Sequence, residues 1–127
     1  MASSYTTSID MLTGTEPVTS SAGVSSNTVG TAIDVSLREN LTVQFICTAY
    51  TSGDGNFYLD GSNDGTNWVL GIAFLDVTST TPTTLVNSKV LGSKTSAAAY
   101  IQGKWKYLRC HVDIAGVGTY SAFLFGS

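Results

Sequence analysis

The sequence predicts an all-β protein folded as a single antiparallel β-sandwich of jelly-roll or Greek-key type. Roughly eight or nine short strand-like runs recur at intervals of roughly 8–12 residues, which is typical of sandwiches and barrels. No segment has the periodicity of an amphipathic helix. The 127 residues suit one domain and are enough to bury a core. We therefore expect a β-sandwich domain over residues 21–127, preceded by an N-terminal arm or peripheral strand over residues 1–20.

The N-terminal 20 residues are polar and irregular, and Pro17 argues against a helix there. Two interpretations stay open, a frayed end and a segment that adds to a sheet edge or lies along a partner. The apolar side chains expected to contact the partner are Tyr5, Ile9, Met11 and Leu12. Ordering backbone costs ~1–2 kcal/mol per residue, so only a strand-like arm gains overall. Deleting residues 1–14 is expected to leave the sandwich folded and to weaken attachment.

The clearest strand is Leu41–Tyr50, where apolar side chains at odd positions alternate with mainly polar ones at even positions. An earlier strand is predicted over Thr28–Ser36, with a polar turn at Arg38–Asn40 between the two. Residues 51–56 contain Ser-Gly-Asp-Gly-Asn and predict a turn after the strand, because these residue types tolerate or stabilise turn conformations.

A β-hairpin with a polar tip is predicted around Asp60–Asn67. Asn, Asp and Gly tolerate positive φ, and the side chains of Asn and Asp bond back to nearby backbone. Phe57–Leu59 precedes the tip as a strand, and Trp68–Leu70 follows it as another. Residues 72–75 are predicted as a strand and residues 76–84 as a loop. Residues 85–91 are predicted as a further strand, and residues 93–98 as a loop or a short helical turn.

The last third predicts a second hairpin. Lys104–Ile114 alternates between two faces, Ala115–Gly118 turns the chain, and Thr119–Phe125 returns as the final strand. The alternation in the two clearest strands, together with the strand before the polar tip, predicts which side chains are buried: Leu41, Val43, Phe45, Leu59, Leu108, Cys110 and Val112.

The low charge of the chain excludes several classes of function. Charged residues make up 12% of the sequence, and the net charge is −3. We expect no nucleic-acid partner, because neutralising phosphates needs clustered Lys and Arg. No apolar run approaches the ~20 residues of a membrane span, so no membrane partner is expected. The N-terminus lacks a basic start and an apolar core, so we expect no secretory signal.

The two cysteines predict buried thiols. Cys47 shares its strand face with apolar side chains, and so does Cys110. Their separation in the sequence excludes a CxxC motif, while a disulfide and a functional thiol remain open alternatives.

The sequence predicts no catalytic site, no metal site and no cofactor. Arg109, His111 and Asp113 alternate on one strand face, but no nucleophile accompanies His111, the only histidine. We interpret these residues as an exposed or interface strand face.

Two weaker hypotheses concern ligands. Asp60-x-Ser62-x-Asp64-Gly65 is similar to the first half of a calcium loop, but Gly71 stands where the closing Glu belongs, which favours a plain hairpin tip. Exposed aromatic side chains could instead stack on sugars, and the candidates are Trp68, Trp105, Tyr107 and Tyr120.

Two motifs carry a resemblance to a known group of proteins. The first is Gly-Ser-Asn-Asp-Gly-Thr-Asn-Trp over residues 61–68. The second is the alternating Trp-x-Tyr-x-Arg-x-His-x-Asp of residues 105–113, followed by Gly-Val-Gly-Thr-Tyr at 116–120. Over roughly residues 55–125 the chain resembles small β-sandwich structural proteins of tailed bacteriophages.

The resemblance implies a non-enzymatic capsid cement (decoration) protein, or another accessory virion protein. Such a protein is made in the host cytoplasm, resides in the virion, binds the major capsid protein and forms a homotrimer. One alternative is a tail- or fibre-associated structural protein. The other is a carbohydrate-binding module of discoidin-like type, which shares the wording Gly-Ser-x-Asp-Gly-x-x-Trp but is longer and secreted.

Overall fold

The computed structural model describes residues 7–16, 18, 23–78 and 85–126, and over these residues the chain is built from antiparallel strands without a helix. The all-β prediction is therefore confirmed. No helix in the described part is long and apolar enough to cross a membrane. The strands are β1 (Ile9–Asp10), β2 (Thr28–Val29), β3 (Ile33–Asp34), β4 (Thr42–Ser62), β5 (Phe74–Asp76), β6 (Leu85–Val86), β7 (Lys89–Leu91), β8 (Ser96–Ile101) and β9 (Tyr107–Phe125).

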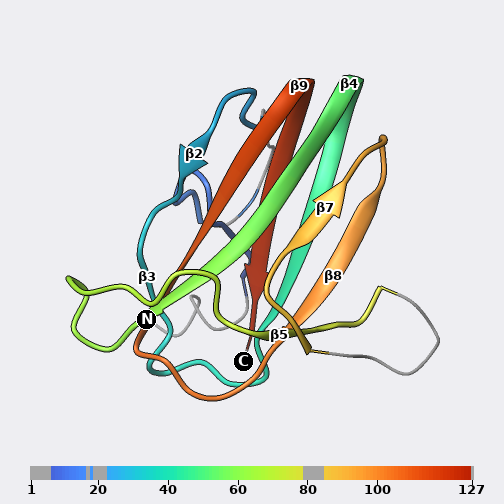
Figure 1. Ribbon diagram of the computed structural model, residues 1–127. Coiled ribbons are helices and arrows are strands. Elements are labelled where there is room, and N and C mark those ends of the chain that lie inside the picture. The colour runs from blue at the N-terminus through green and yellow to red at the C-terminus, as the bar shows by residue number, and fades with distance from the viewer. Residues whose placement is uncertain (1–6, 17, 19–22, 79–84, 127) are drawn as a thin grey trace.

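All of these strands belong to one hydrogen-bonded sheet, which is folded over into two layers. The long strands β4 and β9 pair with each other from end to end. Phe45 and Phe57 lie twelve positions apart on β4, a separation of about 40 Å in a straight strand. Their ring centroids are nevertheless only 4.7 Å apart. The β4–β9 pair therefore turns back on itself, as the upper end of the molecule in Figure 1 shows.

Two glycines opposite each other permit this bend. Gly53 of β4 pairs with Gly116 of β9, and both have positive φ, at 75° and 93°. A side chain on either glycine meets backbone of the opposite strand. The turns predicted at residues 51–56 and 115–118 are thus corrected. The residues expected to form turns instead bend β4 and β9, which continue through both segments because the two strands stay paired there.

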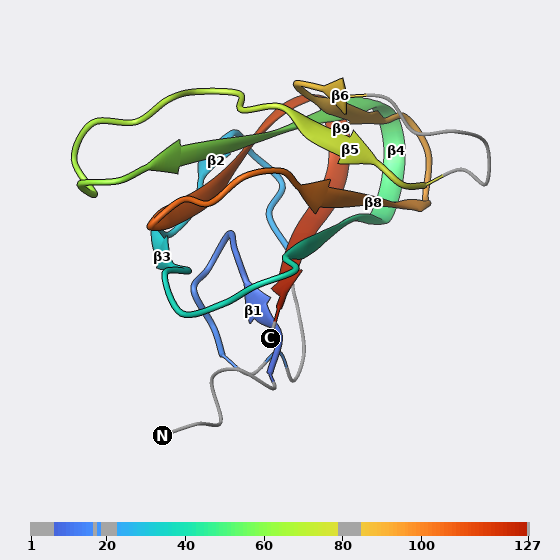
Figure 2. The same ribbon diagram turned by 90° about the horizontal axis from the view of Figure 1, so that it is seen from below.

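Each layer contains one half of the folded ladder. The first layer holds residues 42–47 of β4 and 119–125 of β9, together with β1, β8, β5 and β6. The second holds residues 55–62 of β4 and 107–114 of β9, together with β2, β3 and β7. In Figure 2, β1 lies beside the end of β9. The sandwich that the sequence predicts is therefore formed by one sheet, whose two halves pack face to face.

Aromatic side chains fill the space between the layers. Phe57 contacts both Phe45 and Tyr120, and Phe45 also contacts Phe74. Burial raises the pKa of the Tyr120 hydroxyl to about 12. All seven side chains predicted to be buried are buried: Leu41, Val43, Phe45, Leu59, Leu108, Cys110 and Val112.

The buried-thiol prediction is also confirmed, because Cys47 and Cys110 are both free and buried. Burial raises the pKa of the Cys110 thiol. A thiol that stays protonated reacts poorly, so this one behaves as a small apolar side chain.

The shorter predicted elements need correction. The strand expected at Thr28–Ser36 is split into β2 and β3, which pair with different parts of β9. The segment at 85–91 is likewise split into β6 and β7. Residues 96–98 begin β8 instead of forming a helical turn or loop, because they pair with β4.

The segment expected as an N-terminal arm or peripheral strand holds an edge strand and core side chains over its described residues. β1 pairs with β9, and Ile9, Met11 and Leu12 are buried within this chain. Arg38, expected in a polar turn, is buried and forms an ion pair with Glu16 at 3.1 Å. It also donates to the backbone oxygens of residues 7 and 126. Residues 7–16 are therefore packed and bonded as part of the sandwich.

Candidate functional site

The outer face of the second layer carries a row of polar and aromatic side chains. Antiparallel pairing places Tyr58 opposite His111 and Asp60 opposite Arg109. Paired residues point to the same side of a sheet, while Leu59 and Cys110 between them point into the core. Four side chains that are scattered in the sequence thus meet on one small area, which we call the Asp60 cluster.

Asp60 is the centre of this cluster and is completely buried. Its Oδ2 accepts from Arg109 Nε at 3.0 Å and from His111 Nδ1 at 2.8 Å. Its Oδ1 accepts from the backbone N–H of Gly71 at 3.0 Å. A buried carboxylate is costly unless charges and donors compensate it, and here three donors do so.

Aromatic rings cover the two basic side chains. Tyr58 stacks on His111 with ring centroids 4.6 Å apart and an interplanar angle of 12°. Trp68 lies against the guanidinium of Arg109, with 4.2 Å between Cζ and the ring centroid. These contacts restrict the orientation of both basic side chains, and the Arg–Trp contact adds a cation–π attraction.

A tightly bonded loop brings Trp68 to this position. Asp64 Oδ1 accepts from the backbone N–H groups of Thr66 and Asn67, both at 2.8 Å. The hydrogen bond from the backbone N–H of Asn67 is the main cause that lowers the pKa of Asp64 from its usual 3.8. Beyond the tip, Gly61 and Val69 exchange two backbone hydrogen bonds of 3.0 and 2.8 Å. The hairpin predicted here exists as a capped loop closed by this bridge.

The structure distributes the other predicted residues differently. Asp113 is exposed and lies opposite Asn56, apart from the Asp60 carboxylate. Asp60 is directed to Arg109 and His111, so it does not complete a calcium loop with Ser62 and Asp64. In the described part of the chain, no group of three or more His, Cys, Asp or Glu side chains is arranged to hold a metal ion.

The four aromatic candidates for sugar stacking do not form one surface. Tyr120 is fully buried between the layers. Trp105 packs against Gly61, where even a Cβ would collide with the indole ring. Trp68 is occupied by Arg109. Tyr107 has Lys106 Nζ over its ring, 5.5 Å from the centroid.

The side chains expected to contact a partner are found inside the protein. Ile9, Met11 and Leu12 belong to the hydrophobic core of this chain. Tyr5 lies outside the described residues.

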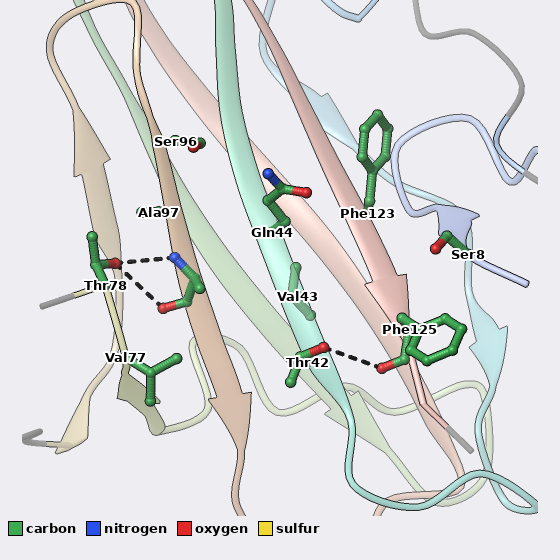
Figure 3. Close-up of a pocket in the computed structure, with 11 residues that line it drawn as sticks. Ser8, Thr42, Val43, Gln44, Val77, Thr78, Ser96, Ala97, Phe123 and Phe125 are labelled. Carbon is green, nitrogen blue, oxygen red and sulfur yellow. Dashed lines mark hydrogen bonds between the residues drawn. The ribbon is translucent and has the colours of Figure 1, made fainter. Parts of the chain in front are cut away.

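A second surface feature lies on the outer face of the first layer (Figure 3). It is a shallow depression of about 410 Å³ without a charged side chain among its lining residues. Thr42 Oγ1 donates to the backbone oxygen of Phe125 along one side, and Thr78 Oγ1 bonds with the backbone of Ala98 on the other. The lining is uncharged and combines apolar side chains with hydroxyl groups, in contrast to the Asp60 cluster.

Comparison with known proteins gives one similar fold. No protein-family model matches the sequence, and no curated protein matches it. Among solved structures, the crystal structure of the SPBc2 prophage-derived protein YomS is similar, with a TM-score of 0.58 and 16% sequence identity. The match covers 93% of this chain and 90% of that one. The two proteins therefore share this fold over nearly their whole lengths.

Proposed function

We propose that this chain is a non-enzymatic bacteriophage virion protein that binds the major capsid protein and strengthens the capsid shell. The observation that carries the proposal is the similarity in fold to a prophage-derived protein, which covers 93% of this chain. The bacteriophage resemblance of the motifs at residues 61–68 and 105–120 supports the same origin.

The architecture suits a protein whose task is mechanical. The ladder between β4 and β9 connects both layers, so a load on one layer reaches the other through backbone hydrogen bonds. The buried Asp60 carboxylate uses its charge to fix Arg109 and His111. We propose a homotrimer on the shell, because one contact patch repeated around a threefold axis closes the assembly.

Binding to empty heads tests the proposal. Heads of the phage that encodes this chain are prepared from a strain lacking its gene, mixed with the purified full-length protein and sedimented. We expect saturable co-sedimentation and a higher temperature of head disruption. Heads that already carry the protein are the control and should bind no more. Absence of binding to gene-deleted heads contradicts a cement role, and binding to tails instead favours the tail-associated alternative.

The trimer has its own measurement. Light scattering over a micromolar dilution series is expected to give three times the mass of the 127-residue chain. A monomer at every concentration, together with one copy per binding site on heads, contradicts the homotrimer and leaves head binding intact.

A further inference from the structure

The depression on the outer face of the first layer results from the order of side chains across the sheet (Figure 3). Strand pairing places Gln44 of β4 between Phe123 of β9 and Ala98 of β8. The Ala98 carbonyl accepts from the Val77 N–H, which places Val77 on the far side of Ala98. Paired residues point to the same side of a sheet, and the methyl group of Ala98 is shorter than both of its neighbours. The face is therefore hollowed here, and we call this depression the Gln44 groove.

The Gln44 groove is large enough for a small ligand and has no charge. Its volume of about 410 Å³ lies within the range of about 300–1,000 Å³ that is usual for ligand sites. An ion that enters such a site loses part of its hydration, and the lining offers no opposite charge in return. The lining therefore favours an uncharged ligand.

The backbone beneath the groove is already hydrogen-bonded. Residues 42–46 of β4 pair with β8 on one side and with β9 on the other. The N–H of Ala98 donates to Thr78 Oγ1, and its carbonyl accepts from Val77. An extended peptide that adds to a sheet needs free backbone groups at an edge. A ligand in this groove is instead recognised by side chains.

The side chains of the groove supply two kinds of contact. Among the described residues, Gln44 and Ser96 form no side-chain hydrogen bond, and Figure 3 draws none from either. An amide and a hydroxyl can each donate and accept. Phe123 is half-buried and Phe125 is 44% exposed, so both add apolar surface beside these polar groups. A sugar ring matches this combination, because it has hydroxyl groups around its rim and C–H groups that pack on an aromatic face.

We infer that the Gln44 groove binds an uncharged saccharide. Gln44 and Ser96 bond to its hydroxyl groups, and a sugar ring packs against Phe123 or Phe125. None of the four aromatic residues that the sequence suggested for sugar stacking lines this groove. The binding activity is additional to the proposed capsid role and does not depend on it.

NMR titration of the full-length protein tests the site. The probes are four neutral oligosaccharides, namely maltotetraose, cellotetraose, laminaritetraose and chitotetraose. We expect at least one of them to cause saturable shifts of the Gln44 side-chain amide and of the Phe125 ring signals. Tetragalacturonate, which carries a carboxylate on each ring, should bind more weakly. The inference is wrong if no neutral probe causes saturable shifts, or if tetragalacturonate binds at least as tightly as the best of them.

Two variants test the polar and the apolar contacts separately. Gln44→Leu keeps the approximate size of the side chain and loses its hydrogen bonds, and Phe125→Ala removes an exposed ring. Each should weaken binding of the best neutral probe by about tenfold. Thr48→Val and Val117→Ala are the matched controls, because they alter exposed positions of the same two strands outside the groove. Both controls should bind as the unaltered protein does, and unchanged affinity in both Gln44→Leu and Phe125→Ala contradicts the site.

Dilution of the protein without sugar tests the alternative occupant, a second copy of this chain. The Gln44 and Phe125 signals should not move between high and low protein concentration. If they shift on dilution, and sugar does not shift them further, the groove is an interface between copies and the saccharide inference is wrong.

Discussion

Asp60 is the residue on which the outer face of the second layer depends most. It is fully buried, forms an ion pair with Arg109, and accepts further hydrogen bonds from His111 and the backbone N–H of Gly71. Removing one partner of a buried ion pair is strongly destabilising, since the remaining charge loses its compensation. The same carboxylate also orients the side chains of Arg109 and His111.

The first prediction concerns this carboxylate. Asp60→Asn should lower the free energy of unfolding by about 3–5 kcal/mol, because Arg109 and His111 lose their shared anion. Asp113→Asn is the matched control, with the same chemical change at an exposed position of the same sheet face. It should change the free energy by less than about 0.5 kcal/mol. Urea unfolding at neutral pH measures both, and equal values for the two variants contradict a supporting role for Asp60.

At the scale of the element, the bend in β4 and β9 depends on Gly53 and Gly116. Both occupy the left-handed region, where a Cβ is strained, and both lie against backbone of the opposite strand. The bend is what brings Phe45 onto Phe57, so the packing between the layers depends on it.

The second prediction tests the bend. Gly116→Ala should cost about 1–3 kcal/mol from backbone strain alone, and more if the Cβ displaces Ser52. Gly92→Ala is the control, because Gly92 has no positive φ and a Cβ added there would have its nearest neighbour at 3.9 Å, an ordinary contact distance. Thermal unfolding of the two variants is the measurement. A Gly116→Ala protein as stable as Gly92→Ala shows that the bend tolerates a side chain.

The third prediction concerns the loop that carries Trp68. Hydrogen bonds from the Asn67 amide and its neighbours lower the pKa of Asp64. The folded pKa is below the unfolded one, so the stabilisation is complete above about pH 4 and is lost as pH falls through the lowered value. Asp64→Asn should therefore destabilise the protein at neutral pH, and the difference should shrink only under strong acid.

NMR checks this prediction directly. The carboxyl carbon of Asp64 and the amide of Asn67 should titrate together, below the usual value of 3.8 for an Asp side chain. The carboxyl carbon of the exposed Asp113 serves as the comparison within the same sample. A midpoint at 3.8 or above for Asp64 contradicts the capped loop.

For the whole molecule, the N-terminal segment completes the sandwich. Ile9, Met11 and Leu12 are buried in the core. Glu16, at the end of the segment, forms an ion pair with the buried Arg38. Burying each apolar side chain contributes about 1.5–3 kcal/mol, so the three together approach the total stability of about 5–15 kcal/mol typical of a protein.

The fourth prediction reverses the expectation drawn from the sequence alone. Deleting residues 1–14 should leave the protein unfolded or strongly destabilised, because this removes β1 and three core side chains. The point variant Met11→Ala should cost about 2–5 kcal/mol, whereas Thr13→Ala at an exposed position should be near neutral. Circular dichroism with urea unfolding is the measurement. A truncated protein as stable as the full chain shows that the segment is dispensable.

The sequence by itself determined the all-β fold class and the inward face of most strands. Alternation between Leu41, Val43 and Phe45 depends only on the two-residue period of a strand and on the need to bury apolar surface. The burial of the Cys110 side chain followed from the same rule. The polar tip at Asp64 was also predictable, since Asn, Asp and Gly act through contacts with their immediate neighbours.

Tertiary structure alone decided how the strands pair, and with that it decided the candidate site. Gly53 and Gly116 look like two separate turns in the sequence, and only their pairing across the ladder turns them into a common bend. Asp60 meets Arg109 and His111 because of the register between two strands that are far apart in the chain. Ile9 and Met11 are buried because β9 offers an edge to β1. Register and edge pairing are contacts between distant segments, and local residue patterns do not encode their partners.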